Sequence, residues 1–211
     1  MDETTLKPLI RQFVRDVVRT SALQFGEFLL RSGRTSPFYL DLRTFRSFPS
    51  VLLNASRLLW SLVPKNPAPD CIADVPTAAT PFVSVIATQY SIPMITPREP
   101  KEHGTKGAID GVFEPGQRVV LLDDLITTAG SKLTAIQTLR DAGLVVEDVC
   151  VLIDRGQGGR EGLQEVGCSL YAAISGKVLF KLLAETEPPA LTREQLKTVL
   201  DYLASDEAQH S

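Results

Sequence analysis

The chain has 211 residues, 44% of them hydrophobic, and a formal net charge of −3 at pH 7. This length and hydrophobic content suit one domain with a full core and exclude two large domains. The acidic balance provides no long-range attraction for a phosphate backbone, so we expect no nucleic-acid partner.

The chain contains three cysteines, and no two of them share a C-x-x-C spacing. They lie in apolar stretches, which predicts buried reduced thiols of a cytoplasmic protein rather than a cysteine metal site. The N-terminus is charged from its second residue, and no apolar run approaches the length of a membrane span. We therefore expect neither a secretory signal nor a membrane partner.

The N-terminal segment combines a helical and a hairpin pattern. Apolar side chains recur at steps of three and four from Leu6 to Val17, which predicts an amphipathic helix. Residues 25–43 then alternate apolar and polar side chains on both sides of a Ser-Gly-Arg-Thr-Ser-Pro turn, as two short strands of a hairpin do. We expect the helix and hairpin, residues 1–47, to form a small hood.

The rest of the chain alternates helices with short apolar strands. Strands are expected at 71–75, 92–96, 118–122, 148–153 and 170–174, and helices at 49–63, 79–90 and 130–142, with one more after Asp154 and two at the end. Such alternation predicts an α/β fold with right-handed crossovers and a mostly parallel sheet flanked by helices. We expect one domain over 1–206, with its core at 48–206 and a flexible tail at 207–211.

The segment VVLLDDLITTAGS, Val119 to Ser131, places two carboxylates after an apolar strand and small residues before a helix. Ligands of open α/β sheets bind beyond the carboxyl ends of the strands, where Asp123 and Asp124 are expected. The small residues and the helix start can cradle a phosphate. The carboxylates suit sugar hydroxyls or, through them, Mg²⁺. This combination predicts a ribose 5-phosphate site; the alternative is an ordinary turn with an acidic helix entry.

The same segment resembles the loop that binds 5-phosphoribosyl-1-pyrophosphate (PRPP) in type I phosphoribosyltransferases. The sequence departs from that pattern at Ala129, where many members have glycine. The resemblance implies the fold of that family and a catalytic role for the acid pair. It also implies that PRPP contacts the whole loop: Asp123, Asp124, Leu125, Ile126, Thr127, Thr128, Ala129, Gly130 and Ser131.

The hairpin sequence FGEFLLRSGRTSPFYLDLR looks like the N-terminal signature of orotate phosphoribosyltransferases. The resemblance implies that Phe38 and Tyr39 lie beside orotate, with Arg31 at a position where the family usually has lysine. Arginine keeps the charge there but changes its geometry. By the same resemblance, Thr127 reaches the edge of the base.

The loop PREPKEHGTKGAIDG, residues 97–111, is long, polar and rich in cations that suit pyrophosphate. It is either a lid or a mobile solvated loop. It resembles the flexible catalytic loop of the same family, which implies that Lys101 assists departure of pyrophosphate and that His103 and Arg98 contact PRPP. Arg98 replaces a lysine of that motif and Pro97 replaces an arginine, so one expected cation is missing.

The segment VLIDRGQGG ends a strand with Asp154 and Arg155 and continues into a glycine-rich turn. An arginine beyond a strand end can bind a carboxylate with two parallel hydrogen bonds, and orotate carries a carboxylate that uracil lacks. The alternative is an ordinary Asp-Arg ion pair. The motif matches the orotate-binding arginine of the family, which implies that Arg155 determines base specificity.

The segment DVPTAATPF, residues 74–82, resembles the pyrophosphate-binding loop of the family. Backbone amides of residues 77–80 can receive pyrophosphate oxygens at the start of a helix. The alternative is a plain helix cap at Thr77.

Together these resemblances imply transfer of ribose 5-phosphate from PRPP to orotate, with Mg²⁺ bound mainly through PRPP. They also imply a homodimer in which the lid of one subunit serves the site of the other. A phosphoribosyltransferase for another base and a PRPP-sensing regulator remain alternatives. A dinucleotide-binding Rossmann domain ranks last, because the sequence has no G-x-G-x-x-G.

Overall fold

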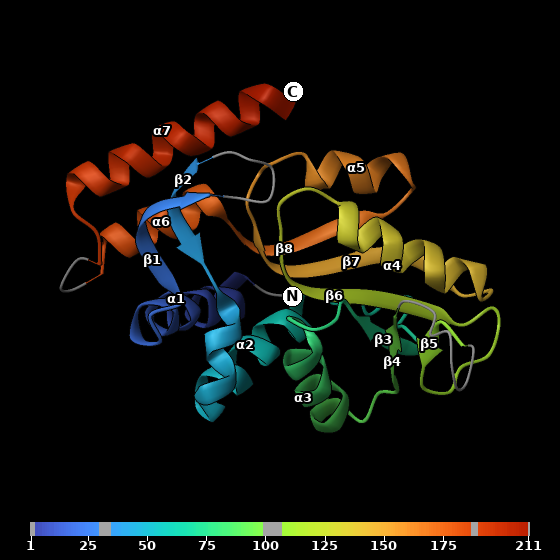
Figure 1. Ribbon diagram of the computed structural model, residues 1–211. Coiled ribbons are helices and arrows are strands. Elements are labelled where there is room, and N and C mark those ends of the chain that lie inside the picture. The colour runs from blue at the N-terminus through green and yellow to red at the C-terminus, as the bar shows by residue number, and fades with distance from the viewer. Residues whose placement is uncertain (1–2, 30–34, 99–106, 187–189, 211) are drawn as a thin grey trace.

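The computed structural model describes residues 3–29, 35–98, 107–186 and 190–210. Within these residues a six-stranded sheet runs through the molecule, with helices on both faces and a two-stranded hairpin beside it (Figure 1). The predicted α/β fold with a mostly parallel sheet is confirmed.

The strands of the main sheet lie in the order β5-β4-β3-β6-β7-β8. They span β3 Cys71–Asp74, β4 Met94–Pro97, β5 Ile109–Asp110, β6 Arg118–Ile126, β7 Val145–Asp154 and β8 Ser169–Ser175. Neighbouring strands are parallel except β4 and β5. The central strands are rich in Val, Ile and Leu and are buried on both faces, as a parallel sheet covered by helices requires.

Each face of the sheet has its own apolar core, because successive strand side chains point to opposite faces. In β6, Val120 and Leu122 belong to one core, whereas Val119 and Leu121 belong to the other. The first core includes side chains of α1 Glu3–Arg19, α2 Pro49–Leu62, α3 Thr80–Tyr90, α6 Gly176–Ala184 and α7 Arg193–His210. The second includes side chains of α4 Gly130–Asp141 and α5 Gly159–Glu165.

The N-terminal hood consists of α1, the antiparallel strands β1 Leu23–Leu29 and β2 Thr35–Leu40, and the 3₁₀ helix η1 Leu42–Ser47. Phe38 of β2 is fully buried, and its ring centroid lies 4.7 Å from that of Phe180 in α6 and 5.9 Å from that of Tyr202 in α7. The last two helices, for which the sequence suggested no role, therefore pack against strand β2 of the hood.

Strand β6 continues to Ile126, although the sequence pattern predicted an end near Leu122. The extension follows from its neighbour: β7 runs alongside, and Leu125 pairs with Ile153. The acid pair therefore lies within the strand rather than beyond it, and pairing with β7 fixes its backbone.

Two further elements differ from the prediction. The polar loop after β4 contains the short strand β5, which pairs antiparallel with β4. Helix α7 continues to His210, within the segment expected to be a flexible tail. Its start is stabilised by a capping box in which Thr192 and Gln195 bond to each other's backbone N–H.

Among the described residues, no helix has the length and apolar content needed to span a membrane.

Candidate active site

The polar residues identified in the sequence gather at the carboxyl ends of three adjacent parallel strands. Asp74 ends β3, the acid pair lies near the end of β6, and Arg155 follows the last residue of β7. Asp74 pairs with Leu122, and Ile126 pairs with Asp154. This register brings the three strand ends to one edge of the sheet. In open α/β sheets this edge is where ligands bind.

The predicted phosphate loop connects β6 to α4. Its main chain turns through residues 127–129, and α4 begins at Gly130 without a side-chain cap on its first N–H groups. Thr128, Gly130 and Ser131 are exposed at this helix start. Uncapped N–H groups and the helix dipole make such a start a ready anion site.

Ala129, the departure from the family pattern, does not project into this anion site. Its side chain is buried and faces α5, where a Cβ added to Gly162 would lie 3.0 Å from that of Ala129. The extra methyl group is therefore accommodated in the core below the loop.

A glycine of α5 packs directly beneath the same loop. A Cβ added at Gly159 would lie 2.5 Å from Ile126 Cγ1 and 2.7 Å from the carbonyl oxygen of Thr127. These separations are too short for any side chain to fit without movement of the loop. Gly159, which the sequence presented only as part of a glycine-rich turn, thus sets the position of the predicted phosphate loop.

The acid pair is almost completely buried. Asp123 Oδ1 accepts a hydrogen bond of 2.8 Å from the N–H of Asp124, and Asp124 Oδ1 accepts one of 2.7 Å from the N–H of Leu125. Burial, followed by the charge of Asp123, raises the pKa of Asp124 from 3.8 to about 8. The Asp124 carboxyl therefore takes up a proton more readily than an ordinary aspartate does.

Lys132 of α4 is a site residue that the sequence analysis missed. Its side chain is buried; Nζ forms an ion pair with Asp123 Oδ2 and donates a 2.7 Å hydrogen bond to the carbonyl of Leu125. A lysine in the first turn of a helix ordinarily points to solvent, so no local pattern marked it. The adjacent carboxylates themselves were the available signal, because a buried acid pair requires a nearby cation.

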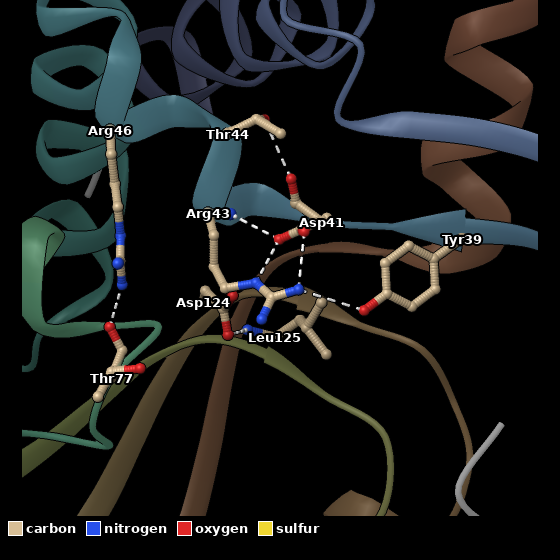
Figure 2. Close-up of polar contacts among 8 residues, drawn as sticks. All are labelled: Tyr39, Asp41, Arg43, Thr44, Arg46, Thr77, Asp124 and Leu125. Atoms are coloured by element: carbon tan, nitrogen blue, oxygen red, sulfur yellow. Dashed lines mark hydrogen bonds and ion pairs between the residues drawn. The ribbon is translucent and has the colours of Figure 1, made fainter.

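The hood brings a second cation over the acid pair. Arg43 Nε and Nη2 bind both oxygens of Asp41, at 2.6 and 2.8 Å, and Nη2 lies 3.3 Å from Tyr39 Oη. The guanidinium lies above Asp124 and Leu125 (Figure 2). Its pKa is raised above the usual value, mainly by Asp41 and to a smaller extent by Tyr39 and Asp124.

Arg46 links the hood to the loop that resembles a pyrophosphate-binding loop. Its Nη2 donates to the carbonyl oxygen of Thr77 (Figure 2). Helix α3 begins at Thr80 with Ala79 as its N-cap, so the alternative of a helix cap at Thr77 is wrong. Thr80 instead donates to the fully buried Asp74, which also accepts a 2.5 Å hydrogen bond from Thr96.

Arg155 lies against the hood. Its guanidinium carbon is 4.7 Å from the centroid of the Phe38 ring, a cation–π arrangement. The neighbouring Asp154 is bound by the N–H of Gly156 at 2.9 Å and by Arg160 Nη2 at 3.3 Å. Phe38 is itself buried under this contact, whereas Tyr39 is partly exposed, so the two predicted flanking aromatics differ in accessibility.

The lid residues are only partly described. Lys101 and His103, like Arg31 of the hairpin, lie outside the described residues. Arg98 is at the base of the loop, where its Nε pairs with Asp110 Oδ1 at 2.7 Å and its backbone N–H bonds to Ala108. The paired strands β4 and β5 thus join the two ends of the predicted lid.

The residues present suit Mg²⁺ that arrives with a substrate. Within the described parts of the chain, no three His, Cys, Asp or Glu side chains are grouped so that they could hold a metal ion. Magnesium in phosphate-transfer sites is commonly held by substrate oxygens and few protein groups. Binding of Mg²⁺ mainly through PRPP stays a prediction.

Comparison with solved structures identifies the class of protein. The UMP synthase of Leishmania donovani superposes with a TM-score of 0.84 at 33% identity, over 92% of this chain and 42% of that one. The fold and the strand-end site together define a type I phosphoribosyltransferase. No family model matches the chain.

Curated relatives identify the family. The orotate phosphoribosyltransferase of Thermoplasma acidophilum is 35% identical over 159 residues, which cover 75% of this chain and 91% of that protein. The chain belongs to the orotate phosphoribosyltransferase family. It is also 35% identical over 188 residues to the uridine 5′-monophosphate synthase of Caenorhabditis elegans, covering 88% of this chain but 38% of that relative. The chain thus spans about two fifths of the length of the UMP synthases that it matches.

Proposed function

We propose that this chain transfers the ribose 5-phosphate unit of PRPP to orotate, forming orotidine 5′-monophosphate and pyrophosphate. One observation carries the proposal: the acid pair, the uncapped start of α4 and Arg155 meet at the ends of β6 and β7. A sugar diol, a phosphate and a carboxylate-bearing base each have a matching group there. Membership of the orotate phosphoribosyltransferase family supports the same chemistry.

The sugar phosphate is held along the loop between β6 and α4. The N–H groups of residues 127–131 receive the 5-phosphate, and the acid pair receives the ribose hydroxyls. As the bond from C1 to the diphosphate oxygen breaks, the sugar acquires oxocarbenium character. Fixed carboxylates beneath the ring stabilise that positive charge because they need no reorganisation during the reaction.

The base binds between the hood and the end of β7. Arg155 forms two parallel hydrogen bonds with the orotate carboxylate, and Phe38 orients its guanidinium from below. Tyr39 and Arg31 flank the base, and Thr127 reaches its edge. A pyrimidine nitrogen then donates the electron pair that forms the new bond to C1, and the proton that this nitrogen carried passes to water or to the departing pyrophosphate.

Pyrophosphate leaves with the electron pair of the broken bond. Lys101, His103 and Arg98 of the loop after β4 neutralise its charge, and closure of that loop excludes water that would hydrolyse PRPP. Mg²⁺ bound to PRPP supplies further charge neutralisation on the diphosphate.

We expect the chain to act as a homodimer in which each lid serves the partner's site. We also expect it in the cytoplasm, where its three cysteines, all free and buried, stay reduced. Analytical ultracentrifugation tests whether the protein is a dimer. Mixing Lys101→Ala and Arg155→Ala subunits tests whether the lid is shared. Each mixed dimer should then contain one site with an intact lid and an intact Arg155, so the mixture should recover activity that neither variant has alone.

The central experiment follows orotate loss with PRPP and Mg²⁺ in the wild type and in Arg155→Ala. We expect the variant to lose about 10- to 100-fold in kcat/KM for orotate, the value of a charged hydrogen bond. The ratio of kcat/KM for orotate to kcat/KM for uracil should fall by a similar factor. Arg19→Ala, on the exposed side of α1, is the matched control and should behave as the wild type. An unchanged base preference in Arg155→Ala would refute the assignment.

A further inference from the structure

Lys132 connects two parts of the proposed sugar-phosphate site. It is the third residue of α4, whose first turn forms the proposed phosphate cradle. Its Nζ contacts Asp123 Oδ2 and the carbonyl of Leu125, both in β6. The side chain therefore ties the strand that carries the acid pair to the helix that receives the phosphate.

This lysine is in an unfavourable place for a cation. Only 4% of the residue is exposed, so its ammonium group is removed from water, and it lies at the helix end where the dipole favours anions. An apolar pair of similar size would ordinarily fit such a place at no loss of stability. A role in stability alone does not explain the ion pair.

The contacts of the two carboxylates differ. Asp123 uses both oxygens within the protein, one for Lys132 and the other for the N–H of Asp124. Asp124 uses Oδ1 for the N–H of Leu125, and its carboxyl also shares a hydrogen bond with the Asp123 side chain rather than with a cation. Asp124 also lies below Arg43 of the hood (Figure 2).

We propose that Lys132 is a positioning residue for the sugar phosphate: it fixes the Asp123 carboxylate in one place beneath the loop, so that the acid pair meets the ribose hydroxyls without rearranging. The inference rests on the proposed function. By holding the Leu125 carbonyl as well, Lys132 fixes the spacing between the diol site and the phosphate cradle. Lys132 touches neither substrate, so its loss should weaken sugar-phosphate binding and leave orotate binding intact.

The test compares Lys132→Met with Lys132→Gln, whose amide can still donate a hydrogen bond to Asp123, so both carboxylates stay in place. Circular dichroism shows that each variant is folded, PRPP binding is measured by calorimetry with Mg²⁺, and KM is measured for both substrates. We expect Lys132→Met to bind PRPP about tenfold or more weakly, Lys132→Gln to lose less, and both to keep their KM for orotate within about twofold. Lys132→Arg should recover part of the PRPP affinity.

Arg118→Met is the matched control, because it breaks an ion pair with Asp148 at the opposite end of β6. It should leave PRPP affinity unchanged. Lys132 variants that bind PRPP as tightly as the wild type would overturn the role of Lys132 while leaving the proposed function intact. Absence of PRPP binding in the wild type would overturn both, so the two failures are distinguishable.

Discussion

Two acid–base pairs flank the proposed site, and their surroundings are opposite. In the hood, the side chains of Arg43 and Asp41 are 52% and 21% exposed. In the core, those of Lys132 and Asp123 are each 5% exposed. Water screens the first pair, so it adds little stability and can rearrange when a substrate enters. The second pair is costly to separate, so it holds one geometry.

The hood side and the core side of the proposed site suit different tasks. The hood side has an arginine over Asp124 and a partly exposed Tyr39, which suits a surface that adapts to the base. The core side has a buried ion pair and a glycine contact under the phosphate loop, which suits a fixed cradle. Breaking each side in turn should therefore affect stability very differently.

The largest effect on stability should come from Lys132→Met. Removing the ammonium leaves Asp123 buried without its cation, at a cost of about 3–5 kcal/mol in the free energy of unfolding. Urea denaturation followed by circular dichroism measures it. Adding Asp123→Leu should recover most of the loss; a double variant as unstable as the single one would contradict the account of the pair.

Asp124 should produce a smaller effect that depends on pH. Its folded-state pKa is about 8, against 3.8 for an ordinary aspartate, so the native state keeps a proton that the unfolded chain has lost. Unfolding then releases a proton, and the free energy of unfolding should fall as pH rises from about 4 to about 8. Asp124→Asn should have a shallower slope over this interval.

Denaturation at about pH 5 and about pH 8 checks this slope, because the two values lie inside the interval. The groups facing Asp124 are Asp123 and Lys132 from the core and Arg43 from the hood. Parallel stability curves for Asp124→Asn and the wild type would show that Asp124 does not hold the raised pKa.

Gly159→Ala should cost about 1–3 kcal/mol, because the new methyl group would meet Ile126 and the carbonyl of Thr127. PRPP affinity should fall with it as the phosphate loop moves. Gly130→Ala is the control for stability, since nothing lies within 4 Å of the Cβ it adds. Equal stability of the two variants would show that the loop tolerates displacement.

The smallest change in stability should follow Arg43→Ala in the hood, which removes the ion pair and leaves the Asp41 side chain as the cap of η1. Loss of an exposed ion pair costs about 0.2–1 kcal/mol, and salt should reduce the difference further. Thermal unfolding at low and high ionic strength measures both effects. A loss comparable to that of Lys132→Met would remove the distinction between the two sides of the site.

The sequence predicted the parts of this molecule that depend on local patterns. The helix of Leu6 to Val17, the hairpin and the alternation of strands and helices follow from periodicity and turn chemistry, and the structure confirms them. The acid pair and the small-residue turn were visible because they are contiguous.

The missed features depend on contacts between distant elements. The extension of β6 to Ile126 depends on pairing with β7, which a pattern of apolar residues does not specify. Lys132 is nine residues from Asp123, and only the fold shows that its side chain turns inward. Arg46 reaches a carbonyl 31 residues away. Such contacts require the tertiary structure.

The most direct test of the central claim is a crystal structure of the protein with PRPP and Mg²⁺. We predict the 5-phosphate at the N–H groups that start α4, the ribose hydroxyls on the acid pair, and Asp123 still bound to Lys132. Ribose hydroxyls bound with Lys132 displaced from Asp123 would contradict the assigned role of Lys132. PRPP bound away from the ends of β6 and β7 would contradict the proposed site itself.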